Sequence, residues 1–262
     1  MKLTGNFINH SPENRTYKTG GHLLSIIIPT FNSSVVLREA LDSILFQKYN
    51  DYEIWIMDGA STDDTVAIIK EYQLKHDTIN YVSEKDSGIY DAMNKGAGLA
   101  GGKWLYFMGS DDRLYDNDVL ADLSKVLQHS KADMTYGDVF RKEDNQVYGG
   151  RFSYHKLMSK NICHQAVFIK KEIFERYGPF NIKFRALADH ELNLTLFKNG
   201  IKTKYIKRLI AAFGARGYSS TYYDTAFVER FEEIYNGYKK NIINRIRLKL
   251  DIMLENIKAY DK

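Results

Sequence analysis

Apolar runs and stretches with helical spacing alternate along the first 108 residues of the chain. Short runs rich in Ile, Val and aromatic residues predict buried strands over residues 23–30, 52–57, 80–83 and 103–108. Between them, apolar residues recur every three or four positions and predict helices over 33–47, 65–76 and about 90–100. This alternation predicts an α/β protein with a mainly parallel sheet, right-handed crossovers and flanking helices.

The pattern changes after about residue 133. Short strands are predicted over 134–136, 146–152 and 166–169, followed by a helix over 189–198. Residues 226–259 carry apolar side chains at spacings of three and four, which predicts an amphipathic helix or helical pair. The predicted parts of the chain are a polar tail (1–22), an α/β domain (23–215) with halves 23–115 and 116–215, and a loop with a helical extension (216–262).

Composition and charge narrow the class of protein. The 262 residues are 44% hydrophobic and include one cysteine, Cys163, which excludes an internal disulfide and fits a reducing compartment. The polar first residues predict neither a signal peptide nor a membrane anchor, and no run reaches the ~18 apolar residues of a spanning helix. The net charge of +4 is uneven, because residues 201–262 hold 13 Lys and Arg against 7 Asp and Glu. We expect a cytoplasmic protein with a basic end suited to an anionic surface.

Two acidic turns follow directly on predicted buried strands. Asp58 follows the second strand, and Ser110, Asp111 and Asp112 follow the fourth. Because the carboxyl ends of strands in an open α/β sheet border its ligand crevice, these acids should converge. Oxygen ligands of this kind suit Mg²⁺ or Mn²⁺ together with substrate phosphates. The alternative is ordinary turn and helix-cap chemistry, which accounts for Ser61 better than for a buried carboxylate at Asp58.

Two nucleotide-binding motifs can be set aside. Gly96–Gly101 matches G-x-G-x-x-G, but it closes a predicted helix and precedes a strand, whereas the dinucleotide fingerprint follows a strand and opens a helix. The chain contains no G-x-x-x-x-G-K-[ST] loop either. A dinucleotide-binding site and a P-loop nucleotidase are therefore both disfavoured.

Four motifs in one order carry a resemblance to a known family. They are Ile28-Pro29-Thr30-Phe31-Asn32, Asp58-Gly59-Ala60-Ser61-Thr62-Asp63, the segment Asp86–Gly96, and Ser110-Asp111-Asp112. In this order and spacing, residues 23–215 resemble family 2 glycosyltransferases, inverting nucleotide-sugar enzymes of the GT-A fold. The chain departs from the common D-x-D form of the acidic motif, because Gly109 stands where the first acid usually is.

The resemblance implies donor-binding residues in the first half of the domain and a metal site. Thr30 and Phe31 would lie along the base and ribose of the nucleotide, and Asp58 would read the base. Asp111 and Asp112 would bind ribose and the divalent metal, Mn²⁺ or Mg²⁺, that bridges the diphosphate. The full set implied for the nucleotide sugar is Pro29, Thr30, Phe31, Asn32, Asp58, Ser61, Asp86, Lys95, Ser110 and Asp111.

An inverting transfer needs one base to deprotonate the acceptor hydroxyl. Asp189, at the start of a predicted helix, is the candidate, and capping that helix is its alternative role. His190 and Glu191 are alternative bases that are less favoured, because both are expected to face solvent on this helix. By resemblance, three further residues shape the acceptor pocket or a loop that closes over donor phosphate: His164, Gln165 and Arg216.

The resemblance implies transfer of a hexose from a nucleotide diphosphate sugar, with a UDP-sugar as the first candidate. The acceptor would be a hydroxyl of a lipid-linked glycan in bacterial surface-polysaccharide synthesis. Two rival functions are a non-catalytic nucleotide-sugar or glycan-binding module of the same fold and a sugar nucleotidyltransferase. The second would carry a Gly-rich, Arg-containing loop after the first strand, where this chain has Pro29-Thr30-Phe31-Asn32.

The basic charge of the predicted C-terminal helix indicates a possible binding partner, either a membrane or another part of the protein. Five cationic residues crowd the middle of this helix: Lys239, Lys240, Arg245, Arg247 and Lys249. They could dock the enzyme on the anionic inner face of the plasma membrane. Packing of this helix on the α/β domain or on a second copy of the chain, as a homodimer, is the alternative. Nucleic acid is not an expected partner, since acidic strand ends would repel a phosphodiester backbone.

Overall fold

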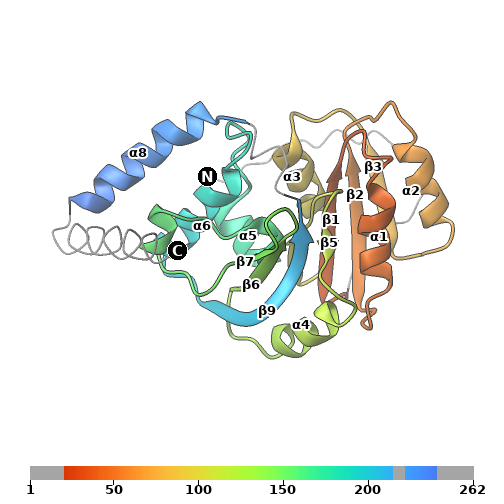
Figure 1. Cartoon of the computed structure of the whole chain (residues 1–262), viewed down its shortest axis with the longest axis horizontal. Coiled ribbons are helices and arrows are strands. Elements are labelled where there is room, and N and C mark those ends of the chain that lie inside the picture. The colour runs from red at the N-terminus through yellow and green to blue at the C-terminus, as the bar shows by residue number, and fades with distance from the viewer. Residues whose placement is uncertain (1–20, 215–221, 241–262) are drawn as a thin grey trace.

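One mixed sheet of nine strands organises the described residues in this computed structural model, which describes residues 21–214 and 222–240 (Figure 1). The strands lie in the order β3-β2-β1-β4-β8-β6-β9-β5, and β7 pairs with β6. Their bounds are β1 Leu24–Thr30, β2 Tyr52–Asp58, β3 Ile79–Ser83, β4 Trp104–Phe107, β5 Arg113–Leu114, β6 Met134–Arg141, β7 Gln146–Tyr148, β8 Val167–Lys170 and β9 Thr203–Phe213. The α-helices are α1 Leu37–Leu45, α2 Thr65–Gln73, α3 Ile89–Leu99, α4 Val119–Leu127, α5 Lys171–Tyr177, α6 Ala188–Lys198 and α8 Thr225–Lys239, with 3₁₀ turns η1 Lys156–Met158 and η2 His164–Ala166.

The predicted parallel half is confirmed. Strands β1 to β4 pair in parallel, with Ile26 of β1 opposite both Ile54 of β2 and Tyr106 of β4. Every residue of β1 and β2 is buried, because α1 and α2 cover one face of this part of the sheet and α3 covers the other. Burial on both faces explains why these strands read as continuous apolar runs.

The first helix begins later than predicted. The sequence placed its start at Ser33, but α1 begins at Leu37 after a turn. The backbone N–H of Ser33 donates to Thr65 Oγ1, and that of Ser34 donates to the Asp63 carboxylate, so this segment bonds to the next loop instead of extending the helix. The two loops after β1 and β2 are thereby joined beside the strand ends.

The second half of the sheet mixes strand directions. Strand β8 is antiparallel to both β4 and β6, and the long strand β9 runs parallel to β6 and antiparallel to β5. The predicted strand over 146–152 stops at Tyr148, because Gly149 and Gly150 take positive φ values of 152° and 82°. The Gly149 backbone also lies against Asp138, where a Cβ would come within 3.0 Å of the Asp138 Cα. The hairpin therefore ends at this pair of glycines.

The rejected dinucleotide motif has a packing role. Gly96 lies in α3, where that helix crosses β1 and β2. A Cβ at this position would lie 2.6 Å from Ile27 Cγ2 and 3.0 Å from Met57 Cγ. The glycine thus permits close contact between α3 and the sheet.

Helix α8 packs on the domain through an aromatic face. Phe227 is buried, and Phe231, Ile234, Tyr235 and Tyr238 lie against the same core. Figure 1 shows α8 alongside α6, at the end of the molecule distant from α1 and α2. The predicted helix over 226–259 is therefore present over 225–239, and its continuation lies outside the described residues. Among the residues that the structure describes, no helix combines the length and apolar character needed to cross a bilayer.

Asp224 joins α8 to the domain. Its carboxylate accepts hydrogen bonds from the backbone N–H of Phe227, as an N-cap, and of Ala186, and it is 4% exposed. Asp224→Ala removes a cap and leaves the Ala186 N–H without its partner, so we expect the free energy of unfolding to fall by about 2 kcal/mol. Urea unfolding against the wild type measures this, with Asp118→Ala as control because that helix N-cap makes no side-chain cap bond. Equal losses in the two variants would contradict the assignment.

Candidate active site

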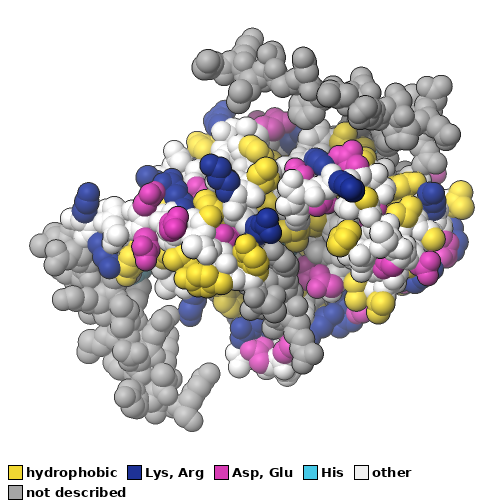
Figure 2. All heavy atoms as spheres, turned by 90° about the horizontal axis from the view of Figure 1, so that it is seen from above, with side chains coloured by type: hydrophobic (Ala, Val, Ile, Leu, Met, Phe, Trp, Pro, Cys, Tyr) yellow, Lys and Arg dark blue, Asp and Glu magenta, His cyan; other side chains and the backbone are white. Residues whose placement is uncertain are grey.

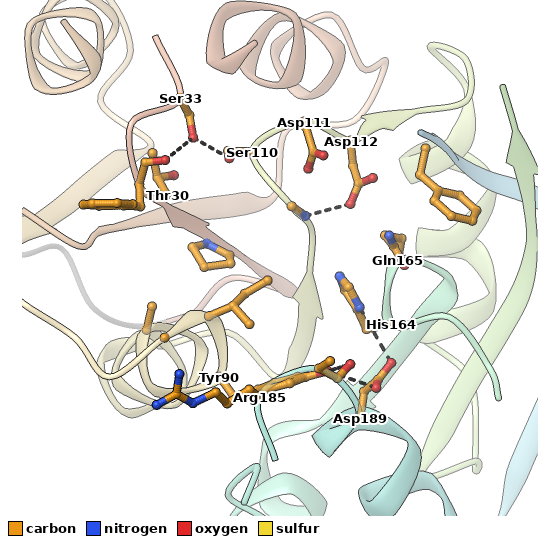
Figure 3. Close-up of a pocket in the computed structure, with 18 of the residues that line it drawn as sticks. Thr30, Ser33, Tyr90, Ser110, Asp111, Asp112, His164, Gln165, Arg185 and Asp189 are labelled. Atoms are coloured by element: carbon orange, nitrogen blue, oxygen red, sulfur yellow. Dashed lines mark hydrogen bonds and ion pairs between the residues drawn. The ribbon is translucent and has the colours of Figure 1, made fainter. Parts of the chain in front are cut away.

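A cavity of about 920 Å³ opens at the carboxyl ends of β1 and β4 and is lined by both halves of the domain (Figure 3). Most predicted site residues line it: Pro29, Thr30, Phe31, Asn32, Asp86, Ser110, Asp111, Asp112, His164, Gln165 and Asp189. Asp58, Ser61 and Lys95 are not among its lining residues, and Arg216 lies outside the described residues. Residues from Pro29 near the start of the domain to Gly214 near its end therefore meet in one site.

One wall of the cavity is the turn after β1, which carries Phe31 and is hydrogen-bonded to the loop after β2. Phe31 is 61% exposed, so its ring is free to stack on a flat ligand. Asn32 takes a positive φ of 47°, and its side-chain oxygen accepts from the backbone N–H of Thr62. The Ser61 hydroxyl accepts from the Asn32 N–H and donates to Asp58. The turn that presents Phe31 is thus tied to the loop after β2.

Asp58 is a buried hydrogen-bond acceptor at the end of β2. Its carboxylate accepts from the Ser61 backbone N–H and from the hydroxyls of Ser61 and Ser83, and it is 2% exposed. These donors supply the compensation that a buried carboxylate needs. In this structure Asp58 and Ser61 support the turn, and base recognition by Asp58 stays a prediction.

Asp86 and Lys95 occupy different positions. Asp86 lines the cavity, its carboxylate accepts from the Gly88 N–H, and burial raises its pKa. Lys95 instead forms ion pairs with Glu84 at 2.8 Å and Asp91 at 3.5 Å, and donates to a backbone carbonyl. Lys95 therefore fastens the loop that carries Asp86 to α3.

The acidic pair after β4 is asymmetric. Asp111 is exposed, whereas Asp112 is 4% exposed and accepts a hydrogen bond from the Gly109 N–H at 2.9 Å. Burial raises the pKa of Asp112 to about 6, and the Asp111 charge adds to that rise against the opposing charge of His164. A Cβ on Gly109 would lie 2.8 Å from one oxygen of each carboxylate. Both carboxylates thus fold back over a glycine where the D-x-D motif has an acid.

This pair fits a divalent cation that is shared with substrate phosphates. Two carboxylate oxygens converge on one point, and the proximity of the two charges is unfavourable without a cation. In the described part of the chain, no group of three or more His, Cys, Asp or Glu residues is placed to hold a metal. Mg²⁺ and Mn²⁺ are commonly held by one or two carboxylates, with phosphates and waters completing the shell. The donor set therefore matches a metal that binds together with a phosphorylated ligand.

Asp189 is the most closely held acid in the cavity. Its Oδ1 accepts from the Tyr90 hydroxyl at 3.0 Å, its Oδ2 accepts from Asn161 Nδ2 at 3.0 Å, and His164 Nδ1 lies 3.7 Å from Oδ2. Burial alone would raise its pKa, but the neighbouring His164 and the surrounding donors hold the pKa below its ordinary value. It is therefore an ionised carboxylate, able to accept a proton. The cap of α6 is Leu187, so Asp189 is not its N-cap.

His164 stands between Asp189 and the acidic pair (Figure 3). Burial alone would lower its pKa, but the ion pair with Asp189 and the charges of Asp112 and Asp111 raise it. Its Nε2 is buried and has no hydrogen-bond partner among the described residues. An imidazolium here offsets negative charge on both sides of the cavity.

His164→Gln should reduce stability more at pH 6 than at pH 9. A histidine whose folded pKa is raised stabilises the fold fully below its unfolded value of 6.5, and this contribution is lost as pH rises through the folded pKa. Urea unfolding of wild type and variant at both pH values measures the difference. An equal loss at pH 6 and pH 9 would show that the His164 charge does not stabilise the fold.

The sequence analysis did not predict several residues that line the cavity, and it predicted the wrong environment for His190. Tyr90, Asn161, Arg141 and Arg185 all line the cavity, and of these only Tyr90 lay inside a recognised motif. The expectation that His190 faces solvent is wrong. It is 8% exposed, its ring stacks on Phe227 and its Nε2 lies 2.8 Å from the Leu157 carbonyl oxygen.

Comparison with known proteins identifies the family of this chain. The family model described as Glycosyl transferase family 2 matches residues 25–227, more than half of the chain. The chain belongs to this family. A Mycobacterium tuberculosis protein named PGL/p-HBAD biosynthesis glycosyltransferase is 39% identical to this family 2 glycosyltransferase over 213 residues. The aligned region covers 79% of this chain and 83% of the relative. Escherichia coli chondroitin synthase is 30% identical over 185 residues, 68% of this chain and 27% of that protein.

Solved structures share the fold of this family 2 glycosyltransferase. S. aureus TarS 1-349 in complex with UDP-GlcNAc superposes with a TM-score of 0.64 at 18% identity, covering 76% of this chain and 61% of that one. Mannosyltransferase PcManGT from Pyrobaculum calidifontis, in complex with GDP-Man and Mn²⁺, gives 0.62 at 22% identity, covering 78% and 62%. The chain spans less than two thirds of either structure. The predicted GT-A fold is confirmed, and the protein is a glycosyltransferase.

Proposed function

We propose that this glycosyltransferase moves a hexose, with inversion, from a nucleoside diphosphate sugar to a hydroxyl of a lipid-linked glycan in surface-polysaccharide synthesis. The observation that carries the proposal is the shared cavity, in which the ionised Asp189 and the Asp111–Asp112 pair lie on either side of His164. Relatives named for PGL/p-HBAD biosynthesis and as a chondroitin synthase support glycan or glycolipid products. Structures holding UDP-GlcNAc and GDP-Man support a nucleotide-sugar donor, with UDP as the first candidate.

The chemistry assigns one role to each side of the cavity. Asp189 accepts the proton of the acceptor hydroxyl as its oxygen bonds to the anomeric carbon, while the bond from that carbon to the donor phosphate breaks on the opposite face. Tyr90 and Asn161 orient the two oxygens of Asp189 through hydrogen bonds. Asp111 and Asp112 would hold Mn²⁺ or Mg²⁺, which neutralises charge on the departing diphosphate when bound.

The acceptor's lipid places the enzyme at the cytoplasmic face of the plasma membrane in this proposal. The described helix α8 directs its apolar residues to the domain, and its remaining surface mixes Glu and Arg or Lys side chains. Figure 2 likewise shows acidic and basic side chains interspersed over the described surface in view. A membrane contact would therefore depend on Arg245, Arg247 and Lys249, which lie outside the described residues. A second copy of the chain is the alternative partner of this region.

Thermal unfolding with nucleotides tests the donor site. UDP, GDP, dTDP and CMP are each added with and without Mn²⁺ to the wild type and to the Asp111→Asn/Asp112→Asn variant. At a hundredfold excess over Kd, a ligand that binds only the folded state stabilises it by about 2.7 kcal/mol. We expect a metal-dependent shift with one nucleoside diphosphate, absent in the double variant. No shift with any nucleotide would remove the proposal, and a shift without sugar transfer to any acceptor would favour a non-catalytic binding module.

A further inference from the structure

The cavity wall is strongly acidic for a site that is to bind a diphosphate. Five carboxylates line it: Asp86, Asp91, Asp111, Asp112 and Asp189. Among the described residues that line the cavity, the lysine and arginine side chains amount to two arginines, Arg141 and Arg185. Because like charges repel strongly where water is scarce, a diphosphate needs cationic contacts beyond one metal ion.

The two arginines differ in how they are engaged. Arg141 forms an ion pair with Asp144 at 2.5 Å, hydrogen-bonds to Gln146 and lies over the Tyr148 ring. Arg185 is exposed, and no described residue forms a hydrogen bond or an ion pair with it. Figure 3 shows the Arg185 guanidinium turned away from Asp189. Arg185 thus lines the cavity as a cation that no residue in the described part of the chain pairs with.

The backbone that carries Arg185 is fixed. Phe184 and Ala186, on either side, are 6% and 4% exposed. The Ala186 N–H donates to the buried Asp224 carboxylate, and the Ala186 carbonyl accepts from the Tyr90 hydroxyl at 3.0 Å. Tyr90 belongs to the first turn of α3, which lines the same wall as the loop of Asp86. Arg185 is therefore held beside the loop of Asp86, a residue that the resemblance implies for binding of the nucleotide sugar.

We propose that Arg185 binds the diphosphate of the nucleotide-sugar donor and stabilises it as the leaving group. The inference rests on the proposed function and adds a residue that contacts substrate. A guanidinium presents two parallel N–H donors that match two phosphate oxygens, which a lysine ammonium does not reproduce. Its contact grows stronger as the breaking bond places additional negative charge on the departing oxygen. Arg185 thus complements a metal at Asp111 and Asp112 from another wall of the cavity.

Binding measurements separate this role from a structural one. Dissociation constants for UDP and for uridine, or for GDP and guanosine if the thermal screen selects guanine, are measured by calorimetry with Mn²⁺ present. We expect Arg185→Gln to weaken diphosphate binding by about 10- to 100-fold and nucleoside binding by less than about twofold. Arg185→Lys should fall between Gln and wild type. Lys183→Gln is the control, because Lys183 is exposed, lies outside the cavity and is two residues before Arg185. This variant loses the same charge and should bind both ligands as the wild type does.

Three results would overturn the inference. The first is unchanged diphosphate binding in Arg185→Gln while the wild type binds it. The second is an equal loss for nucleoside and diphosphate, which would indicate damage to the fold. The third is a raised KM for the acceptor with an unchanged donor Kd, which would place an acceptor phosphate at Arg185. A wild type that binds no nucleoside diphosphate would instead remove the proposed function itself.

Discussion

Asp189→Asn is expected to lower turnover by roughly 10²- to 10⁴-fold, because an amide cannot accept the acceptor proton. The donor's Kd should change little, since Asp189 lies across His164 from the acidic pair. The amide is nearly the same size, and Tyr90 keeps its second hydrogen bond, to the Ala186 carbonyl, whichever way the amide turns. Steady-state kinetics with saturating donor and acceptor measure kcat, and calorimetry measures donor binding.

Glu191→Gln is the matched control for Asp189→Asn. Glu191 lies on the same helix two residues later, bonds to Thr195 Oγ1 and is not a cavity residue. Its substitution removes one carboxylate of the same helix, so it should leave kcat within about twofold of wild type. Turnover of Asp189→Asn within tenfold of wild type would mean that another group is the base. Loss of donor binding along with kcat would indicate a disturbed cavity and not a missing base.

Asp112→Asn is expected to have opposite effects on stability and function. The folded pKa of Asp112 is raised to about 6, so stability falls as pH rises from 3.8 towards 6 and the carboxyl ionises. A neutral amide avoids that cost, and the metal-free variant should be more stable at pH 7.5 by up to about 3 kcal/mol. The Mn²⁺-dependent stabilisation by nucleoside diphosphate, about 2.7 kcal/mol at a hundredfold excess over Kd, should disappear with it.

Thermal and urea unfolding with and without UDP and Mn²⁺ measure both effects. Asp118→Asn is the control, because Asp118 is exposed, outside the cavity and paired at the surface with Lys48. Its effect on stability should lie within about 0.5 kcal/mol of zero, and its Mn²⁺ response should match the wild type. A retained Mn²⁺ response in Asp112→Asn would leave Asp111 as the sole carboxylate ligand. A less stable metal-free variant would contradict the cost assigned to the buried charge.

The first half of the fold could be predicted because each strand there is buried on both faces. Such strands are continuous apolar runs, and the helices between them keep their period. Strand β9 was missed because its first residues are half-exposed and include Lys204, Lys207 and Arg208, which hide the apolar pattern. Helix α5 was missed because it has seven residues and follows β8 without a break. Short, amphipathic or half-exposed elements are set by tertiary partners more than by local sequence.

The residues of the candidate site likewise fall into two groups, those that the sequence pattern could predict and those that depend on tertiary contacts. Carboxylates placed directly after buried strands, such as Asp112, could be found because the sheet dictates where strand ends meet. Tyr90 and Asn161 could not, since their function lies in a hydrogen bond to Asp189 across 99 and 28 positions of sequence. The same holds for Arg185, whose proposed role rests on its lack of a partner among the described residues and on the burial of its neighbours. Periodicity carries no information about such pairings.

The Asp224 carboxylate has a consequence for how the enzyme is made. The loop before Asp189 is tied to it through Ala186, although Asp224 is synthesised 35 residues after the proposed base. Strands β1 to β4 pair with one another within the first half of the domain, so this parallel part of the sheet can form before the later strands leave the ribosome. The loop beside Asp189 receives this tether only when the start of α8 emerges. A nascent or prematurely stopped chain can therefore form its parallel strands while the loop that leads to Asp189 still lacks this hydrogen bond.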